Sequence, residues 1–160
     1  MRVVFAFLIF IISFGSKAEY LDEVIFVKRS DTAMNAAFKN ARETVDDFLE
    51  IAAQRPEEYS GFSAYIKVVD GEAVEYLWVA DVQPYKEDKY IGVVISKPGL
   101  VSNVSYGATV GYTKSDIYDW QYYNNKTKKT VGSFTTCVLL KPGNPEDEKY
   151  KKEVGLDCNT

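Results

Sequence analysis

The sequence contains no histidine, and this absence removes several classes of enzyme from consideration. A Ser-His-Asp triad and a Cys-His pair both need an imidazole base, so neither can be built. The usual zinc sites are excluded too, because the only two cysteines are far apart in the sequence. The Gly-rich phosphate-binding motifs of P-loop and Rossmann proteins are also missing. We therefore expect no metal site and no cofactor, and only carboxylate, Lys or Tyr chemistry stays open to an enzyme.

An excess of basic residues is also lacking. The 19 Lys and Arg residues are outnumbered by 23 Asp and Glu residues, which gives a net charge of −4. Proteins that bind nucleic acid or anionic lipid generally carry a basic surface. We therefore expect neither nucleic acid nor a membrane surface as a partner.

Residues 1–18 are typical of a secretory signal peptide that is cleaved between Ala18 and Glu19. A short positive region at Arg2 precedes an apolar run over residues 3–14, and small residues precede the cleavage point. The run has about 12 residues, whereas a membrane-spanning helix needs about 20. An uncleaved N-terminal anchor is the alternative. We expect a periplasmic protein, with an extracellular location as a second option and no membrane insertion of the mature chain.

The two cysteines, Cys137 and Cys158, are expected to form a disulfide in an oxidising compartment. The bridge would close a loop of about 20 residues and stabilise the fold by about 3 kcal/mol. Because Cys137 lies in an apolar run, the bridge would staple the C-terminal tail, residues 142–160, to the core. Two unpaired thiols are the alternative.

The longest periodic segment runs from Thr32 to Arg55. Its apolar residues recur at three- and four-residue steps, and polar residues fill the other side. Ser30 or Asp31 is a suitable N-cap, and Pro56 stops the pattern. One long amphipathic helix is therefore predicted. A short strand or extended arm is expected before it, at residues 23–29.

The rest of the chain follows the two-residue period of strands. Asp70-Gly71 predicts a tight turn between the first two strands. In the second strand, alternate residues from Val74 to Val82 are expected to share one face. A short surface helix is expected at Pro145–Val154. The predicted strands cover residues 62–68, 72–82, 90–96, 108–113, 120–123 and 130–140.

These elements indicate an α+β fold, in which the long N-terminal helix packs on a twisted, mainly antiparallel sheet. The sheet could curl toward a partial barrel. We expect one domain over residues 19–160, with the disulfide holding its tail.

Several short segments form a set with a distinctive order and spacing between residues 33 and 141. They are Met34-Asn35-Ala36-Ala37, Ala41-Arg42, Phe62 with Ile66-Lys67-Val68, Glu75-Tyr76-Leu77-Trp78-Val79, Gly107 with Val110, Ile117 with Asp119-Trp120, and Gly132 with Phe134-Thr135. The set resembles the YegJ-like family of small bacterial domains of unknown function. The resemblance implies a compact α+β domain, exported in some members, and no known activity or cofactor. Cys137 stands where family members often have a basic residue.

A group of aromatic residues near a predicted sheet rim is the main candidate for a binding site. It consists of Tyr118, Asp119, Trp120 and Tyr122, and Trp78 is a further candidate from the second strand. Tyrosine offers a large contact area at small entropic cost, which suits both protein interfaces and sugar stacking. The alternative for each is structural, with the Trp residues in the core and the Asp fixing a turn.

The carboxylates do not form a recognisable catalytic pair. Glu75 and Asp81 lie on one face of the same strand, but about 20 Å apart, which is too far for a glycosidase-like pair. Asp116 and Asp119 are closer in sequence, and nothing else marks them as catalytic.

The sequence as a whole predicts a non-catalytic periplasmic interaction module, such as an inhibitor or immunity protein, that binds an envelope or extracellular protein. The alternative is a domain that binds a small ligand or an envelope glycan through the same aromatics, and a carboxylate-dependent hydrolase comes third. A concave groove lined by Trp120 and Tyr residues would favour a glycan, whereas a flat patch would favour a protein.

Overall fold

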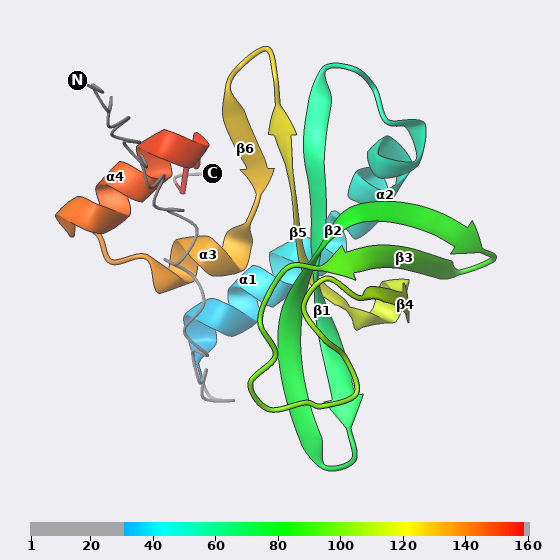
Figure 1. Cartoon of the computed structure of the whole chain (residues 1–160). Helices are drawn as coiled ribbons and strands as arrows, with labels where there is room; N and C mark the ends of the chain where they lie inside the picture. Colours follow the sequence, from blue (N-terminus) through cyan, green and yellow to red (C-terminus); the bar gives the residue numbers. More distant parts are fainter. Residues whose placement is uncertain (1–30, 159–160) are drawn as a thin grey trace, which may run out of the picture.

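A computed structural model describes residues 31–158 (Figure 1). The predicted signal peptide and the predicted arm at residues 23–29 lie outside the described residues. The helices are α1 (Thr32–Glu43), α2 (Val45–Gln54), the 3-10 turn η1 (Lys114–Asp116), α3 (Phe134–Leu139) and α4 (Pro145–Val154). The strands are β1 (Tyr59–Asp70), β2 (Ala73–Lys86), β3 (Lys89–Val94), β4 (Thr109–Thr113), β5 (Ile117–Asn124) and β6 (Lys129–Gly132). Over residues 31–158, no helix combines the length and the apolar character needed to cross a bilayer.

The strands form one antiparallel sheet in the order β4-β3-β2-β1-β5-β6. The α+β class and the antiparallel sheet are therefore confirmed. The sheet stays open, because β4 and β6 form its two edges and do not pair with each other. The sheet therefore does not close into a full barrel within residues 31–158.

The core lies between α2 and one face of the sheet, and Figure 1 shows α1 and α2 crossing behind the strands. Phe48 is fully buried, and Leu49 and Ala52 lie beside it on the same helix. Burial of such apolar surface is the main force that holds a helix against a sheet. The sheet residues beneath α2 include Phe62, Ala64, Ile66, Leu77, Val79, Val82, Val94, Ile117 and Trp120.

The single long helix predicted over Thr32–Arg55 is in fact two helices that meet at Thr44. The Thr44 hydroxyl donates a hydrogen bond to the carbonyl of Asn40 at 2.8 Å, and its backbone leaves the helical region with φ −116° and ψ 4°. Side-chain hydroxyls that bond to nearby carbonyls compete with the helical pattern in this way. The predicted start is confirmed, because the Asp31 side chain accepts from the N–H groups of residues 33 and 34.

The predicted facing of the second strand is confirmed from Val74 to Ala80 and is wrong at Val82. Leu77 and Val79 are buried under α2, so the alternating set that begins at Val74 points to the other face of the sheet. The pairing of β2 with β3 then shifts after Ala80, where Asp81 takes a positive φ of 57°. This bulge returns Val82 to the buried side, because an extra residue reverses the alternation of a strand.

The strand predicted over Thr130–Leu140 ends at Gly132, and α3 follows it. Gly132 has a φ of +84°, and a Cβ there would lie 2.2 Å from the carbonyl oxygen of Trp120. The next residue, Ser133, also takes a left-handed conformation. The carboxylate of Asp119 then accepts hydrogen bonds from the first two N–H groups of α3. This capping starts a helix where the apolar run alone predicts a strand.

The predicted disulfide is present, but it ties the C-terminal segment to a helix rather than to a strand. Cys137 in α3 forms a disulfide with Cys158, with their Cα atoms 5.5 Å apart. The expected helix α4 lies between them in sequence, and the Asn144 side chain caps it by accepting from the N–H groups of residues 146 and 147. The disulfide therefore joins both ends of the α3–α4 segment.

Candidate functional site

Five aromatic rings form a continuous strip, and we call Phe38, Tyr65, Tyr76, Trp78 and Tyr118 the aromatic strip. Neighbouring ring centroids lie 5.1 Å apart from Trp78 to Tyr65, then 5.7 Å to Tyr76, 4.8 Å to Tyr118 and 5.1 Å to Phe38. Aromatic pairs attract each other at such separations. The rings therefore form one connected surface rather than separate side chains.

Strand register sets three of these rings on the sheet face opposite α2. Tyr65 pairs with Trp78, and Tyr76 pairs with Lys67, so these four side chains lie on one face. Their neighbours along the strands, such as Ala64 and Leu77, are buried on the other face. The strip thus follows directly from the two-residue period of the β1–β2 hairpin.

The other two rings come from β5 and α1. The pairing of β1 with β5 shifts between Tyr65 and Ile66, and Tyr118 is the extra residue at this bulge. β6 pairs with the second half of β5, and α1 contacts β5 at Tyr118 and Trp120, which precede that half. Phe38 of α1 therefore reaches both Tyr118 and Tyr76, with centroids 5.1 and 5.7 Å away.

Arg42 lies one helical turn after Phe38, and its Cζ atom is 4.1 Å from the centre of the Tyr118 ring. A cation over a tyrosine ring is attracted by the negative face of the ring. The two residues line a shallow hollow of about 410 Å³, together with Asn35, Phe38, Lys39 and Glu43. This hollow is the concave end of the aromatic strip.

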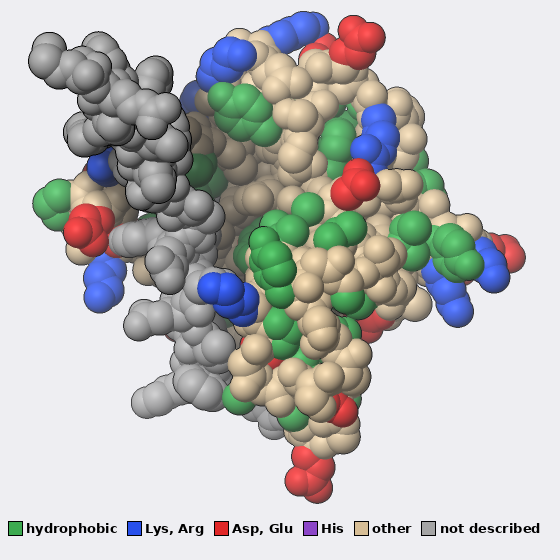
Figure 2. All heavy atoms as spheres, in the orientation of Figure 1, with side chains coloured by type: hydrophobic (Ala, Val, Ile, Leu, Met, Phe, Trp, Pro, Cys, Tyr) green, Lys and Arg blue, Asp and Glu red, His purple; other side chains and the backbone are tan. Residues whose placement is uncertain are grey.

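The strip rings are half-buried, and apolar surface continues beyond them. Val69 and Val74, which pair at the hairpin end, are 50% and 38% exposed. Burial raises the pKa of Tyr65 to about 12, so this hydroxyl stays neutral. On the face in Figure 2, hydrophobic side chains gather over the middle of the sheet and charged ones lie mainly toward its ends.

Trp120 and Tyr122 lie on the helix-covered face instead. Trp120 is 5% exposed, stacks on Phe48 at 5.1 Å and donates from its indole nitrogen to the carbonyl of Ala41 at 3.0 Å. Tyr122 stacks on Trp120 at 6.0 Å and is half-buried. A second shallow hollow, of about 520 Å³, lies at their edges beside Asp47, Glu50 and Gln54 of α2.

Asp119 is fully buried between these two sites. Its carboxylate accepts from the N–H groups of Trp120 (2.7 Å), Phe134 (3.3 Å) and Thr135 (2.7 Å), and from the Thr135 hydroxyl (2.5 Å). Burial raises the pKa of Asp119 to about 6, although each hydrogen bond acts in the opposite direction. The side chain thus joins β5 to α3 and forms no part of the surface.

The other carboxylates considered for catalysis also make structural contacts. Glu75 is buried and accepts from the N–H groups of residues 99–101. Asp81 pairs with Arg55 at 2.6 Å, and Asp116 accepts from the N–H and hydroxyl of Thr113. No group of Cys, Asp and Glu residues within positions 31–158 could hold a metal ion.

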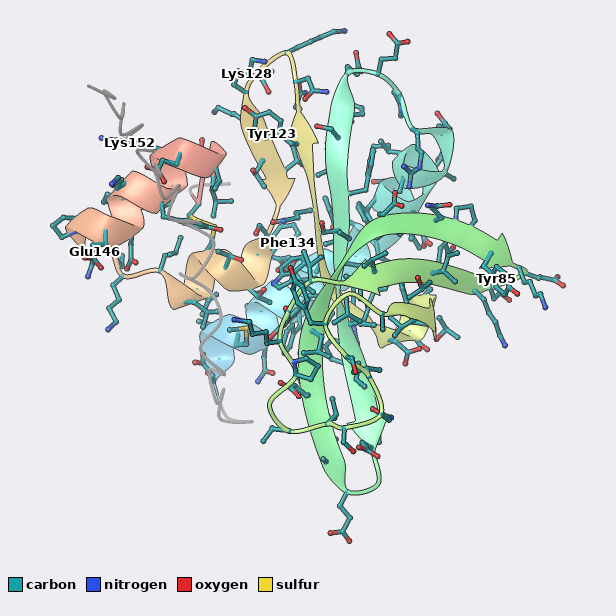
Figure 3. All side chains as sticks on the ribbon, in the orientation of Figure 1. Tyr85, Tyr123, Lys128, Phe134, Glu146 and Lys152 are labelled. Atoms are coloured by element: carbon teal, nitrogen blue, oxygen red, sulfur yellow. A yellow bond between two sulfur atoms is a disulfide. The ribbon has the colours of Figure 1, made fainter. Side chains whose placement is uncertain are left out.

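The structure therefore divides the five predicted site residues among three places. Trp78 and Tyr118 join the aromatic strip, Trp120 and Tyr122 line the second hollow, and Asp119 is buried. Two other tyrosines that are close in sequence lie elsewhere. Tyr112 is buried in the core, and Tyr123 lies near the β5–β6 turn, close to the labelled Lys128 in Figure 3.

Sequence reasoning missed four contributors to the strip: Phe38, Arg42, Tyr65 and Tyr76. A usable signal exists for two of them, because a turn at Asp70-Gly71 followed by Glu72 fixes the hairpin register. That register places Tyr65 opposite Trp78, as observed. Nothing in the sequence indicates that α1 would bring Phe38 and Arg42 to the same surface.

The comparisons with known proteins identify the family of the chain. Residues 31–158 match the family described as "Uncharacterized protein conserved in bacteria (DUF2314)". The chain is 32% identical to the uncharacterized protein YegJ of Escherichia coli K12 over 123 residues, which is 77% of each chain. It is 34% identical over 128 residues to a putative ankyrin repeat protein of Neisseria meningitidis serogroup B, covering 74% of this chain and 49% of that protein. No solved structure matches. The chain belongs to the DUF2314 family.

Proposed function

We propose that this member of the DUF2314 family is a non-catalytic module that binds another protein through the aromatic strip. The observation that carries the proposal is the connected run of five rings, which stays partly exposed and ends at Arg42. Tyr, Trp and Arg side chains supply most of the binding energy in protein interfaces. Apolar patches of this kind on a sheet commonly mark such interfaces.

The shape of the strip favours a protein over a small molecule. Small-ligand sites are concave and enclose most of the ligand surface. Four of the five rings instead lie on strands, and the strip opens into a shallow hollow at its Arg42 end. Because its rings support one another, little side-chain freedom would be lost on binding, which favours affinity.

An exported protein would meet its partner in the bacterial envelope or outside the cell. We propose that residues 1–18 are removed as a signal peptide and that the protein acts in the periplasm. The disulfide between Cys137 and Cys158 is compatible with that oxidising compartment. An inhibitor or immunity protein would fit this location and the absence of an evident catalytic set.

A non-catalytic role is supported by the engagement of the candidate carboxylates. Asp119 and Glu75 are buried, and each is surrounded by hydrogen-bond donors from the backbone. A general acid or nucleophile must instead reach a substrate. We therefore propose that these carboxylates stabilise the fold.

Binding of an envelope glycan is the second candidate, because the second hollow is lined by Trp120 and Tyr122 with polar groups at its rim. Sugars bind to such combinations of aromatic rings and carboxylate or amide groups. The faces of the Trp120 ring are already covered by Phe48 and Tyr122. Only ring edges would therefore meet the sugar, which makes the aromatic strip the better-supported site.

An affinity capture tests the proposal. Mature, oxidised protein (Glu19–Thr160) serves as bait for envelope extract and culture supernatant, with mass spectrometry as the readout. We expect one protein to be enriched stoichiometrically by the wild type and lost with Trp78→Ala. Tyr85→Ala is the matched control, because Tyr85 lies at the far end of the β2–β3 ribbon (Figure 3) and is 58% exposed.

Failure of the bait to enrich any protein, in a preparation shown to be folded by circular dichroism, would contradict the proposal. Equal loss of the captured protein with Trp78→Ala and Tyr85→Ala would also exclude the strip as its site. Either result would move the search to glycans and to the second hollow.

A further inference from the structure

We infer that the protein partner presents an acidic side chain to the hollow at the end of the aromatic strip, where Arg42 binds its carboxylate. The inference rests on the function proposed above and adds the chemistry of the partner. It depends on the position of Arg42 and on the local charge around the strip.

The charge bordering the strip is opposite to that of the whole protein. The chain has a net charge of −4. At the hollow, however, two of the three charged side chains are the cations Lys39 and Arg42, and the third, Glu43, lies 3.7 Å from Lys39 in an i,i+4 ion pair. Lys67 adds a further cation on the strip face, because it pairs with Tyr76. Such a surface attracts and orients an acidic partner.

The chemistry of Arg42 also suits a carboxylate. A guanidinium is planar and presents forked N–H donors that match two carboxylate oxygens. The Tyr118 ring, 4.1 Å from Cζ, holds the group over an aromatic surface. Phe38 then offers an apolar wall for the stem of the entering side chain, since it contacts Tyr118 at 5.1 Å. The hollow thus combines a charge for the carboxylate with apolar contact for the rest of the residue.

A pair of blocked dipeptides provides the test. Acetyl-glutamyl-phenylalanine amide carries one side-chain carboxylate, and acetyl-glutaminyl-phenylalanine amide has the same shape without the charge. Each is titrated into the mature, oxidised protein, and binding is followed by the NMR shifts of the Tyr118 ring and the Arg42 side chain. We expect the acidic peptide to bind about threefold more tightly, the range of a partly exposed ion pair.

Variants identify the responsible residue. Arg42→Gln should remove the preference for the acidic peptide, and Arg42→Lys should retain part of it, because Lys keeps the charge but not the forked geometry. Lys128→Gln removes the same charge from the β5–β6 turn and should leave the preference unchanged (Figure 3). Equal binding of the two peptides, or a preference that survives in Arg42→Gln, would overturn the inference.

The two proposals fail in different ways. A protein that is captured in a Trp78-dependent manner, together with no preference between the peptides, would leave the interaction function standing and refute the carboxylate site. A clear Arg42-dependent preference without any captured protein would support the carboxylate site and refute the interaction function.

Discussion

Replacing Asp119 should show how far its buried hydrogen bonds stabilise the fold. The carboxylate is fully buried and accepts hydrogen bonds from four donors, three from the backbone and one from the Thr135 hydroxyl. Asp119→Ala leaves all of these donors without an acceptor. Asp119→Asn keeps the shape and one acceptor oxygen, but it turns an amide N–H₂ group toward the Thr135 donors.

The expected magnitudes follow from these contacts. Each buried donor without a partner costs about 1–3 kcal/mol. Part of this loss is offset, because the variants no longer bury a charge: a pKa raised from 3.8 to about 6 corresponds to about 3 kcal/mol in the ionised state. We therefore expect Asp119→Ala to lower the free energy of unfolding by about 3–5 kcal/mol. For Asp119→Asn we expect a loss of about 1 kcal/mol.

The pH dependence has a definite sign. Burial raises the pKa of Asp119 in the folded protein. The group therefore makes its full contribution to the free energy of unfolding below about pH 4. That contribution is lost as the pH rises through about 6. The wild type should therefore lose stability relative to Asp119→Asn between pH 4 and pH 7, by about 3 kcal/mol.

Urea unfolding of both variants and the wild type, followed by circular dichroism from pH 4 to pH 7, measures these differences. Asp47→Asn is the matched control, because Asp47 is exposed on α2. Equal losses for Asp119→Ala and Asp119→Asn, or a difference between wild type and Asp119→Asn that does not change with pH, would refute the reasoning.

Three further predictions concern stability and are measured by thermal or urea unfolding. Joint replacement of Cys137 and Cys158 by Ser should lower the free energy of unfolding by about 3 kcal/mol and make the stability insensitive to reducing agent. A variant as stable as the oxidised wild type would contradict this prediction. Asp31→Ala removes a helix cap and should cost about 1 kcal/mol, so an unchanged melting temperature would count against the capping. Gly132→Ala should lower the free energy of unfolding by more than about 2 kcal/mol, because the added Cβ would meet Trp120. Gly143→Ala, which is also at positive φ but in open space, should lower it by less. Equal losses would exclude the close contact as the cause.

Local patterns predicted several elements well. The alternation of apolar residues around Asp70-Gly71 predicted the β1–β2 hairpin. The three- and four-residue spacing of apolar residues predicted the helical region that ends before Pro56. The two cysteines of the chain predicted the disulfide between Cys137 and Cys158. These predictions succeed because periodicity, turn chemistry and the number of cysteines are properties of short segments or of composition.

The errors arise where tertiary contacts override a local pattern. The apolar run after Gly132 has the composition of a strand, yet Asp119, distant in sequence, caps it as a helix. Asp81 introduces a bulge that periodicity alone does not show. The candidate site was divided for the same reason, because neighbours in sequence such as Tyr118 and Trp120 belong to different clusters.

The comparison of Tyr118→Ala with Tyr122→Ala tests the central claim most directly. The two tyrosines are four residues apart on β5 but belong to the aromatic strip and to the second hollow, respectively. The partner from the affinity capture is titrated against each folded variant by calorimetry. We predict that Tyr118→Ala weakens binding about 30-fold or more, as at an interface hot spot, and that Tyr122→Ala stays within about twofold of the wild type. Strong loss with Tyr122→Ala and none with Tyr118→Ala would contradict the account.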